Sequence, residues 1–99
     1  MAEIRCEKVS RGLRSTEKSV TVRNAVTGRQ SSLRVEADFL TLDKGNYYLP
    51  VGVVQEEREQ GLALIELPQE PDSGSTRLWV RIADFLEPTE WKARAAWRD

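Results

Sequence analysis

Apolar and polar residues alternate along most of this 99-residue chain, which is the period of a β-strand that buries one face. The alternation predicts that each apolar set faces a common core while its charged neighbours face water. One segment, Leu62–Leu67, is almost wholly apolar and too short for a helix, so it predicts a central strand. The predicted inward-facing sets are Ile4 and Cys6; Val20, Val22 and Val26; Leu33, Val35, Ala37 and Phe39; Tyr47, Leu49, Val51 and Val53; and Leu78, Val80 and Ile82.

Glycine, proline and polar runs separate these strands. Thr27-Gly28 and Asp43-Lys44-Gly45-Asn46 are turn sequences, because Gly tolerates the positive φ of a tight turn. Pro50 has no N–H to donate to a neighbouring strand, so its own strand is expected at a sheet edge or bulged at that point. The acidic run 55–60 and the Pro-containing run 68–75 are predicted to be exposed loops.

One tetrapeptide occurs twice, as Ala37-Asp38-Phe39-Leu40 and as Ala83-Asp84-Phe85-Leu86. Each copy follows a strand, a Gly-containing turn and a second strand, which predicts one local design used twice. In this interpretation both Phe-Leu pairs are apolar hooks that return to the core. The two Asp residues are expected to cap the hooks by accepting backbone N–H groups. The alternative is that they form a carboxylate pair for acid–base chemistry.

Six short strands with frequent turns predict a mostly β fold, a small SH3-like barrel of five to seven antiparallel strands with a short C-terminal helix. Residues 1–87 are assigned to the barrel domain and residues 88–99 to the helical tail, with Thr89 as its cap. The segment 49–54, followed by an acidic loop, an apolar strand and Trp79-Val80, is similar to small bacterial barrels of the PRC type. That resemblance implies a fold class only.

Composition and charge indicate in which compartment the protein is expected and what kind of partner its surface could bind. No apolar run approaches the roughly 20 residues of a membrane-spanning helix, and residues 1–5 show no secretory signal. The single Cys6 cannot form an internal disulfide and shares the inward face with Ile4, so we expect a core thiol in a cytoplasmic protein. The net charge is -1, but residues 1–34 carry +5 and residues 35–99 carry -6. Either basic and acidic strands neutralise each other locally, or the basic third forms a face for an acidic partner.

Residues that carry catalytic chemistry are scarce. The chain has no His, one Cys and no Gly-rich phosphate loop, which argues against zinc sites, nucleotide cofactors and the commonest general base. We therefore expect neither a metal nor a cofactor, and we expect that the protein is not an enzyme.

Aromatic residues that are predicted to face outward suggest binding instead. If Leu78, Val80 and Ile82 point inward, Trp79 points outward between Arg77 and Arg81, and by the same rule Tyr48 and Pro50 point outward from their strand. Small barrels use such surfaces to hold peptides. The alternative is that the C-terminal helix covers this face, with Trp91 or Trp97 packed against Trp79.

The sequence thus favours a non-enzymatic binding or adaptor module that presents Tyr48, Pro50, Trp79, Arg77 and Arg81 to a protein partner. The alternative function is association with nucleic acid through the basic first third, where arginines would contact phosphates. No interaction with a membrane is expected.

Overall fold

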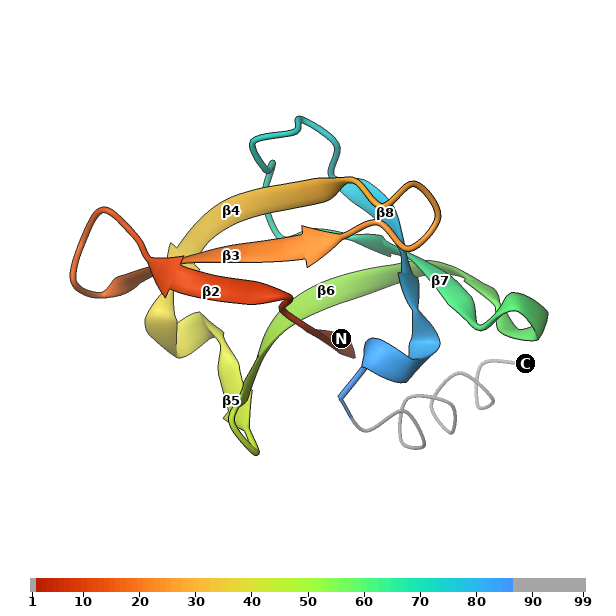
Figure 1. Ribbon diagram of the computed structural model, residues 1–99, viewed down its shortest axis with the longest axis horizontal. Helices are drawn as coiled ribbons and strands as arrows, with labels where there is room; N and C mark the ends of the chain where they lie inside the picture. Colours follow the sequence, from red (N-terminus) through yellow and green to blue (C-terminus); the bar gives the residue numbers. More distant parts are fainter. Residues whose placement is uncertain (1, 87–99) are drawn as a thin grey trace.

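The computed structural model describes residues 2–86, which form two open antiparallel sheets and no α-helix, so the prediction of a mostly β fold is confirmed (Figure 1). The predicted C-terminal helix, with Trp91 and Trp97, lies outside the described residues. One sheet has five strands, in the order β1-β6-β7-β8 with β5 also paired to β6, and the other has the order β2-β3-β4. The eight strands are β1 (Ala2–Arg5), β2 (Lys8–Arg11), β3 (Glu17–Arg23), β4 (Gln30–Glu36), β5 (Thr41–Asp43), β6 (Asn46–Glu57), β7 (Leu62–Glu66) and β8 (Arg77–Arg81). The described residues also contain three short 3-10 helices: η1 (Ala37–Phe39), η2 (Arg58–Gln60) and η3 (Ile82–Asp84).

The two sheets enclose one hydrophobic core. Its members come from both sheets and include Ile4, Val20, Leu49 and Ile65, none of them more than 1% exposed. The predicted inward faces of β3, β4, β6, β7 and β8 all contribute to it, and Cys6 is buried as expected. Val26 was predicted to face inward and does not: β3 ends at Arg23, and Val26 lies exposed in the turn that follows.

Pro50 lies in β6, a central strand of the five-stranded sheet, at a point where one side of the strand has no paired neighbour among the described residues. The Cys6 N–H donates to the Tyr47 carbonyl, so the odd-numbered residues in this part of β6 direct their backbone groups toward β1. The even-numbered residues face the opposite edge, where β5 pairs as far as Tyr48 and β7 begins to pair at Gly52. Pro50 therefore occupies the gap between β5 and β7, where an N–H would find no strand partner among the described residues. The register shift of β6 falls later, between Val53 and Gln55.

The acidic run 55–60 is not the exposed loop that its composition predicts. Residues 55–57 extend β6 and pair with β7, and residues 58–60 form η2. Gly61 ends η2, and its φ of 69°, which glycine readily adopts, lets the chain reverse into β7. The predicted turns at Gly28 and at Lys44-Gly45 are confirmed, because all three residues have positive φ.

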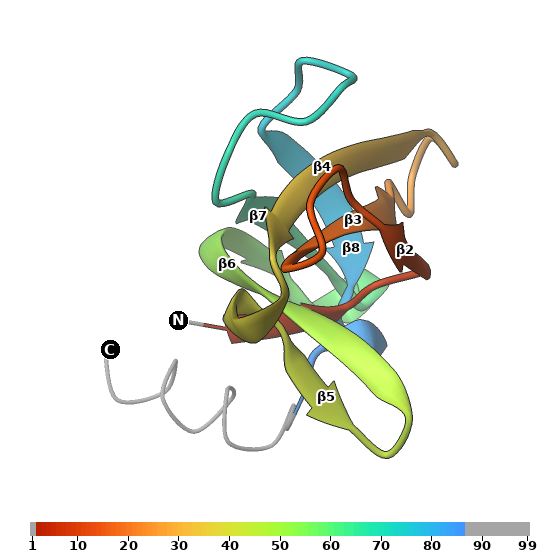
Figure 2. The same cartoon turned by 90° about the vertical axis from the view of Figure 1, so that its left-hand side faces the viewer.

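The two sheets are joined side by side, but they do not close into a barrel. On one side the chain passes directly from β1 in the first sheet to β2 in the second, through Cys6 and Glu7. On the other side only isolated hydrogen bonds connect the two parts within the described chain: the N–H of Ala25, in the turn after β3, donates to the Trp79 carbonyl of β8, and the N–H of Asp72, in the loop before β8, donates to the Ser32 carbonyl of β4, each at 2.8 Å. Because these bonds do not form a continuous ladder, no closed barrel is detected in residues 2–86, in contrast to the predicted SH3-like barrel (Figure 2).

The two copies of the repeated tetrapeptide differ in burial. Phe85 is 3% exposed and forms a bridge with Ile4, whereas Phe39 is 42% exposed. Leu40, which follows Phe39, packs against the core in its place. Both predicted Phe-Leu hooks therefore reach the core, the second through Phe85 and the first through Leu40, whereas the prediction that Phe39 faces inward is wrong. Among the described residues, no helix is long and apolar enough to cross a bilayer.

Candidate binding cleft

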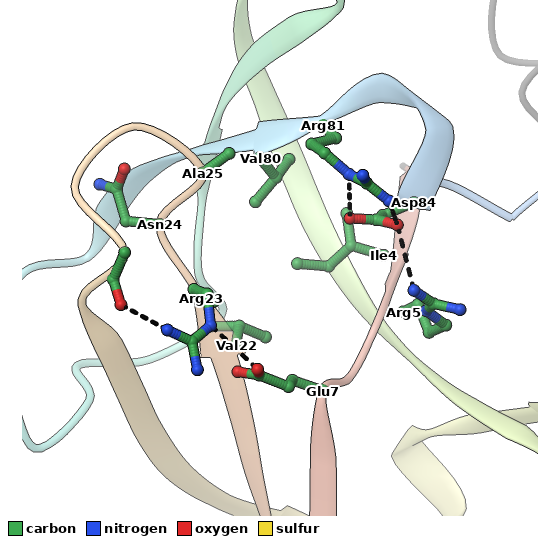
Figure 3. Close-up of a pocket in the computed structure, with 11 residues that line it drawn as sticks. Ile4, Arg5, Glu7, Val22, Arg23, Asn24, Ala25, Val80, Arg81 and Asp84 are labelled. Carbon is green, nitrogen blue, oxygen red and sulfur yellow. Dashed lines mark hydrogen bonds and ion pairs between the residues drawn. The ribbon is translucent and has the colours of Figure 1, made fainter.

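A cleft of about 430 Å³ opens where the two sheets fail to close (Figure 3). It lies between the end of β3, the passage from β1 to β2, the edge of β8 and η3. We call it the seam cleft. The residues that line it are Ile4, Arg5, Glu7, Val22, Arg23, Asn24, Ala25, Gly28, Val80, Arg81 and Asp84.

One wall of the seam cleft carries two guanidinium groups that share one carboxylate. Arg81 donates to Asp84 twice, from Nε to Oδ2 at 3.3 Å and from Nη2 to Oδ1 at 3.1 Å. Arg5 reaches the same Oδ1 through its Nη2 at 3.4 Å. The hydrogen bond to Asp84, and then its negative charge, raise the pKa of Arg81 above its ordinary value.

The facing wall carries a second ion pair, which is more tightly held. Arg23 Nε donates to Glu7 Oε1 at 2.9 Å, and its Nη1 donates to the Gly28 carbonyl at 2.8 Å. Gln30 donates to the other oxygen of Glu7 at 3.2 Å. These two side-chain hydrogen bonds, Arg23 first, lower the pKa of Glu7 below its ordinary value.

Apolar side chains line the cleft between the two charged walls (Figure 3). Ile4, Val22 and Val80 belong to the core, and they also line the cleft. The combination of an apolar floor and a few convergent polar groups is typical of ligand sites.

The charges favour binding of an anionic group over acid–base catalysis. Three guanidiniums face two carboxylates, which leaves one net positive charge. Arg81 and Arg5 together donate three hydrogen bonds to Asp84, fewer than the five N–H groups that each guanidinium carries. Spare donors of this kind suit a planar carboxylate, which accepts a bidentate pair. Among residues 2–86, no group of three or more His, Cys, Asp or Glu side chains is arranged to hold a metal ion.

The structure brings together three of the five residues that the sequence singled out for binding. Arg77, Trp79 and Arg81 alternate on β8 with the buried Leu78 and Val80, so they share the outer face of the five-stranded sheet. Both arginines are exposed and Trp79 is half-buried, directly across from Leu64 on β7. We call these three residues the β8 strip. Arg81 belongs to both the strip and the seam cleft.

Tyr48 and Pro50 lie elsewhere on the same sheet. They are half-buried on β6, opposite Arg5 and Glu3 of β1, whereas Trp79 is in register with Leu64 and, through it, with Gln55. The path from Trp79 to Pro50 crosses two strand spacings and several residues of β6, on the order of 20 Å. Pro50 instead lines a separate, mostly apolar hollow with Phe39 and Val54. The five predicted residues therefore do not form one patch.

Sequence reasoning missed most of the seam cleft. In the sequence, Arg5 and Glu7 are only polar neighbours of buried residues, and Arg23 is one of the arginines of the basic first third that could contact phosphates; nothing in their spacing indicates that the three meet. Asp84 was expected to cap its turn or to pair with Asp38. Within residues 2–86, the hydrogen bonds of the Asp84 carboxylate come from the side chains of two arginines, Arg81 and Arg5, and not from a backbone N–H or from Asp38. The sequence contains one indication of this ion pair, because Arg81 stands three residues before Asp84.

Comparisons with known proteins give no relative from which to transfer a role: no protein family, no curated protein and no solved structure matches the chain.

Proposed function

We propose that the protein is a non-enzymatic binding module that holds an acidic segment of a partner protein across the edge of β8. A carboxylate of the segment binds Arg81 and Arg5 in the seam cleft, and an apolar side chain of the segment packs on Trp79. The observation that carries this proposal is the position of Arg81, which lies in the seam cleft and in the β8 strip at once.

The β8 strip supplies the apolar part of the proposed contact. Trp79 and Leu64 are direct cross-strand neighbours and are both half-buried, so part of each side chain is available to a partner. Tryptophan and arginine are both enriched among the residues that dominate binding energies at protein interfaces. The strip and the cleft are adjacent, because the Trp79 carbonyl accepts the Ala25 N–H that closes one end of the cleft.

The charge arrangement favours a short acidic peptide over a nucleic acid. A phosphate backbone requires a run of cations without intervening carboxylates. In the seam cleft Glu7 and Asp84 lie among the arginines, and on β8 Arg77 is paired with Glu66 at 2.9 Å. This pattern fits a single ligand carboxylate, because few of the side chains next to the arginines are cations that could bind a second negative charge.

The proposal is tested by titrating the isotope-labelled protein with synthetic nine-residue peptides in which Asp and Glu flank a central Leu or Phe. We expect chemical-shift changes confined to Arg5, Arg81, Trp79 and their neighbours. Arg81→Gln is expected to weaken binding roughly tenfold, since it removes charge-assisted hydrogen bonds. Arg34→Gln is the matched control, because Arg34 is also an exposed arginine on a strand but lies on β4 of the other sheet.

Two results would contradict the proposal. Equal losses in Arg81→Gln and Arg34→Gln would show that binding follows net charge and not the cleft. Tighter binding of a single-stranded oligonucleotide than of any peptide, with an affinity that falls steeply as salt rises, would favour the nucleic-acid function instead.

A further inference from the structure

We infer that Asp84 is an internal competitor for the seam cleft: its carboxylate occupies the place at Arg81 and Arg5 that a carboxylate of a bound ligand takes. This inference rests on the proposed function and specifies how the same site recognises its ligand. Binding is then an exchange of one carboxylate for another, and the affinity is set by how firmly Asp84 is held.

The distances show that Asp84 is held loosely. Its contacts with the two arginines are 3.1, 3.3 and 3.4 Å, longer than the roughly 2.7–2.9 Å of strong charge-assisted hydrogen bonds. The side chains of Arg81 and Arg5 are 60% and 48% exposed, so water already competes for these donors. Exposed ion pairs of this kind contribute little to stability. An incoming carboxylate therefore meets little resistance at this wall of the cleft.

The facing wall differs and serves as an internal comparison. Glu7 accepts from Arg23 at 2.9 Å and also from Gln30, while Arg23 is fixed in addition by the Gly28 carbonyl. A ligand that displaced Glu7 would break two hydrogen bonds, one of them the 2.9 Å bond from Arg23, and Arg23 would stay fixed by the Gly28 carbonyl in an orientation set by the chain itself. Exchange is consequently expected at Asp84 and not at Glu7.

The exchange requires no change in the backbone. Asp84 is the last residue of η3, between the buried Ile82 and Phe85. Phe85 bridges to Ile4, and the Leu86 N–H donates to the Glu3 carbonyl at 2.8 Å, so the chain on this side of Asp84 is fixed to β1. Rotation of the Asp84 side chain alone vacates the guanidinium groups while the turn stays in place.

The existing contact also indicates the chemistry of the ligand. Arg81 presents Nε and Nη2 to the two oxygens of one carboxylate, the side-by-side geometry that a planar carboxylate fits. The ligand group is therefore a carboxylate, either an Asp or Glu side chain or the free C-terminus of a chain. A peptide with blocked ends and acidic side chains, and a neutral peptide with a free C-terminus, distinguish these two sources.

The test compares Asp84→Asn with Glu66→Gln. Both substitutions remove one negative charge, and both release an exposed arginine of β8, Arg81 or Arg77, whose side chains are 60% and 58% exposed. Only Asp84→Asn removes the carboxylate that competes in the seam cleft, because the neutral amide that replaces it is a weaker acceptor for the two arginines. We expect it to bind the acidic peptide roughly fivefold or more tightly than the wild-type chain, and to show a saturable shift of the Arg81 Nε resonance with acetate, the simplest carboxylate probe.

The controls make failure of the inference distinct from failure of the proposed function. If the wild-type chain binds the peptide and Asp84→Asn binds it no better, the inference is wrong while the proposed function stands. If Glu66→Gln gains as much as Asp84→Asn, the gain is a net-charge effect and the inference is again wrong. If no peptide binds the wild-type chain but acetate saturates Asp84→Asn at Arg81, the inference holds and the proposed function fails. Unchanged thermal unfolding of both variants confirms that the fold is preserved.

Discussion

Leu40 and Phe85 occupy equivalent positions in two similar turns, although the repeated tetrapeptide pairs Phe85 with Phe39. The Leu40 N–H donates to the Ala37 carbonyl, and the Phe85 N–H donates to the Ile82 carbonyl, so each residue directly follows a 3-10 helix of three residues. The helix begins one residue later in the first copy, relative to the tetrapeptide. At three residues per turn, one residue corresponds to a rotation of about 120°. That offset turns Phe39 outward and brings Leu40 to the core.

This relationship predicts unequal effects for two chemically identical substitutions. Phe85→Ala removes a buried aromatic ring and is expected to lower the free energy of unfolding by about 3–5 kcal/mol. Phe39→Ala removes a ring that is 42% exposed, and we expect a loss below about 1 kcal/mol. Urea unfolding followed by tryptophan fluorescence measures both. Equal losses would mean that the two copies of the tetrapeptide are packed alike.

Neighbouring residues of β8 provide a second comparison. Val80 is 4% exposed and contacts the core, so Val80→Ala is expected to cost about 2 kcal/mol through lost burial and a residual cavity. Arg81→Ala removes an exposed side chain and is expected to cost much less. The same unfolding measurement tests the assignment of faces, which a reversed order of the two losses would overturn.

The inward and outward faces were predictable because they depend on local alternation. Val20 and Val22, Leu49 and Val51, and Leu78 and Val80 are all buried, as a period of two requires. The turns at Gly28 and Gly45 were predictable for a similar reason, since the required positive φ is a property of single residues.

The candidate site was not predictable, because it depends on which strands meet and where pairing stops. Arg5 and Asp84 are 79 positions apart, and their contact follows from the bridge between Ile4 and Phe85. The seam itself exists because Ala25 and Trp79 share a single hydrogen bond instead of a ladder. Pro50 illustrates the same limit: its position in a central strand is allowed by the gap between β5 and β7, which only the register reveals.

The thiol of Cys6 is expected to be unreactive in the folded protein. Burial raises the pKa of Cys6 to about 11, from 9.0 for a free thiol. At pH 8 this shift lowers the thiolate fraction about a hundredfold, and the side chain is also covered by the core. Alkylation with iodoacetamide, followed by mass spectrometry, should therefore be slower in the native protein than in urea, by roughly a hundredfold or more. Comparable rates in the two conditions would place Cys6 at the surface.

The pair between Glu7 and Arg23 should make stability depend on pH in the acid range. The pKa of Glu7 is lowered in the folded state, from 4.5, chiefly by the hydrogen bond from Arg23. The unfolded chain therefore binds more protons than the folded chain just below pH 4.5, and the free energy of unfolding falls as the pH drops through this range. The contribution is fully present above the unfolded pKa and is lost below the folded one.

Glu7→Gln removes the titrating group, and Arg23→Gln removes the donor that lowers its pKa. Both variants are expected to show a smaller decrease in urea midpoint between about pH 5 and pH 3 than the wild-type chain does. The quantity compared is the slope of the urea midpoint against pH within each variant. A uniform loss of stability shifts the midpoint equally at every pH and leaves that slope unchanged. Because the pair forms one wall of the seam cleft, an undiminished slope in both variants would mean that Glu7 and Arg23 are not paired in solution, and the more tightly held wall of the cleft would have to be reassigned.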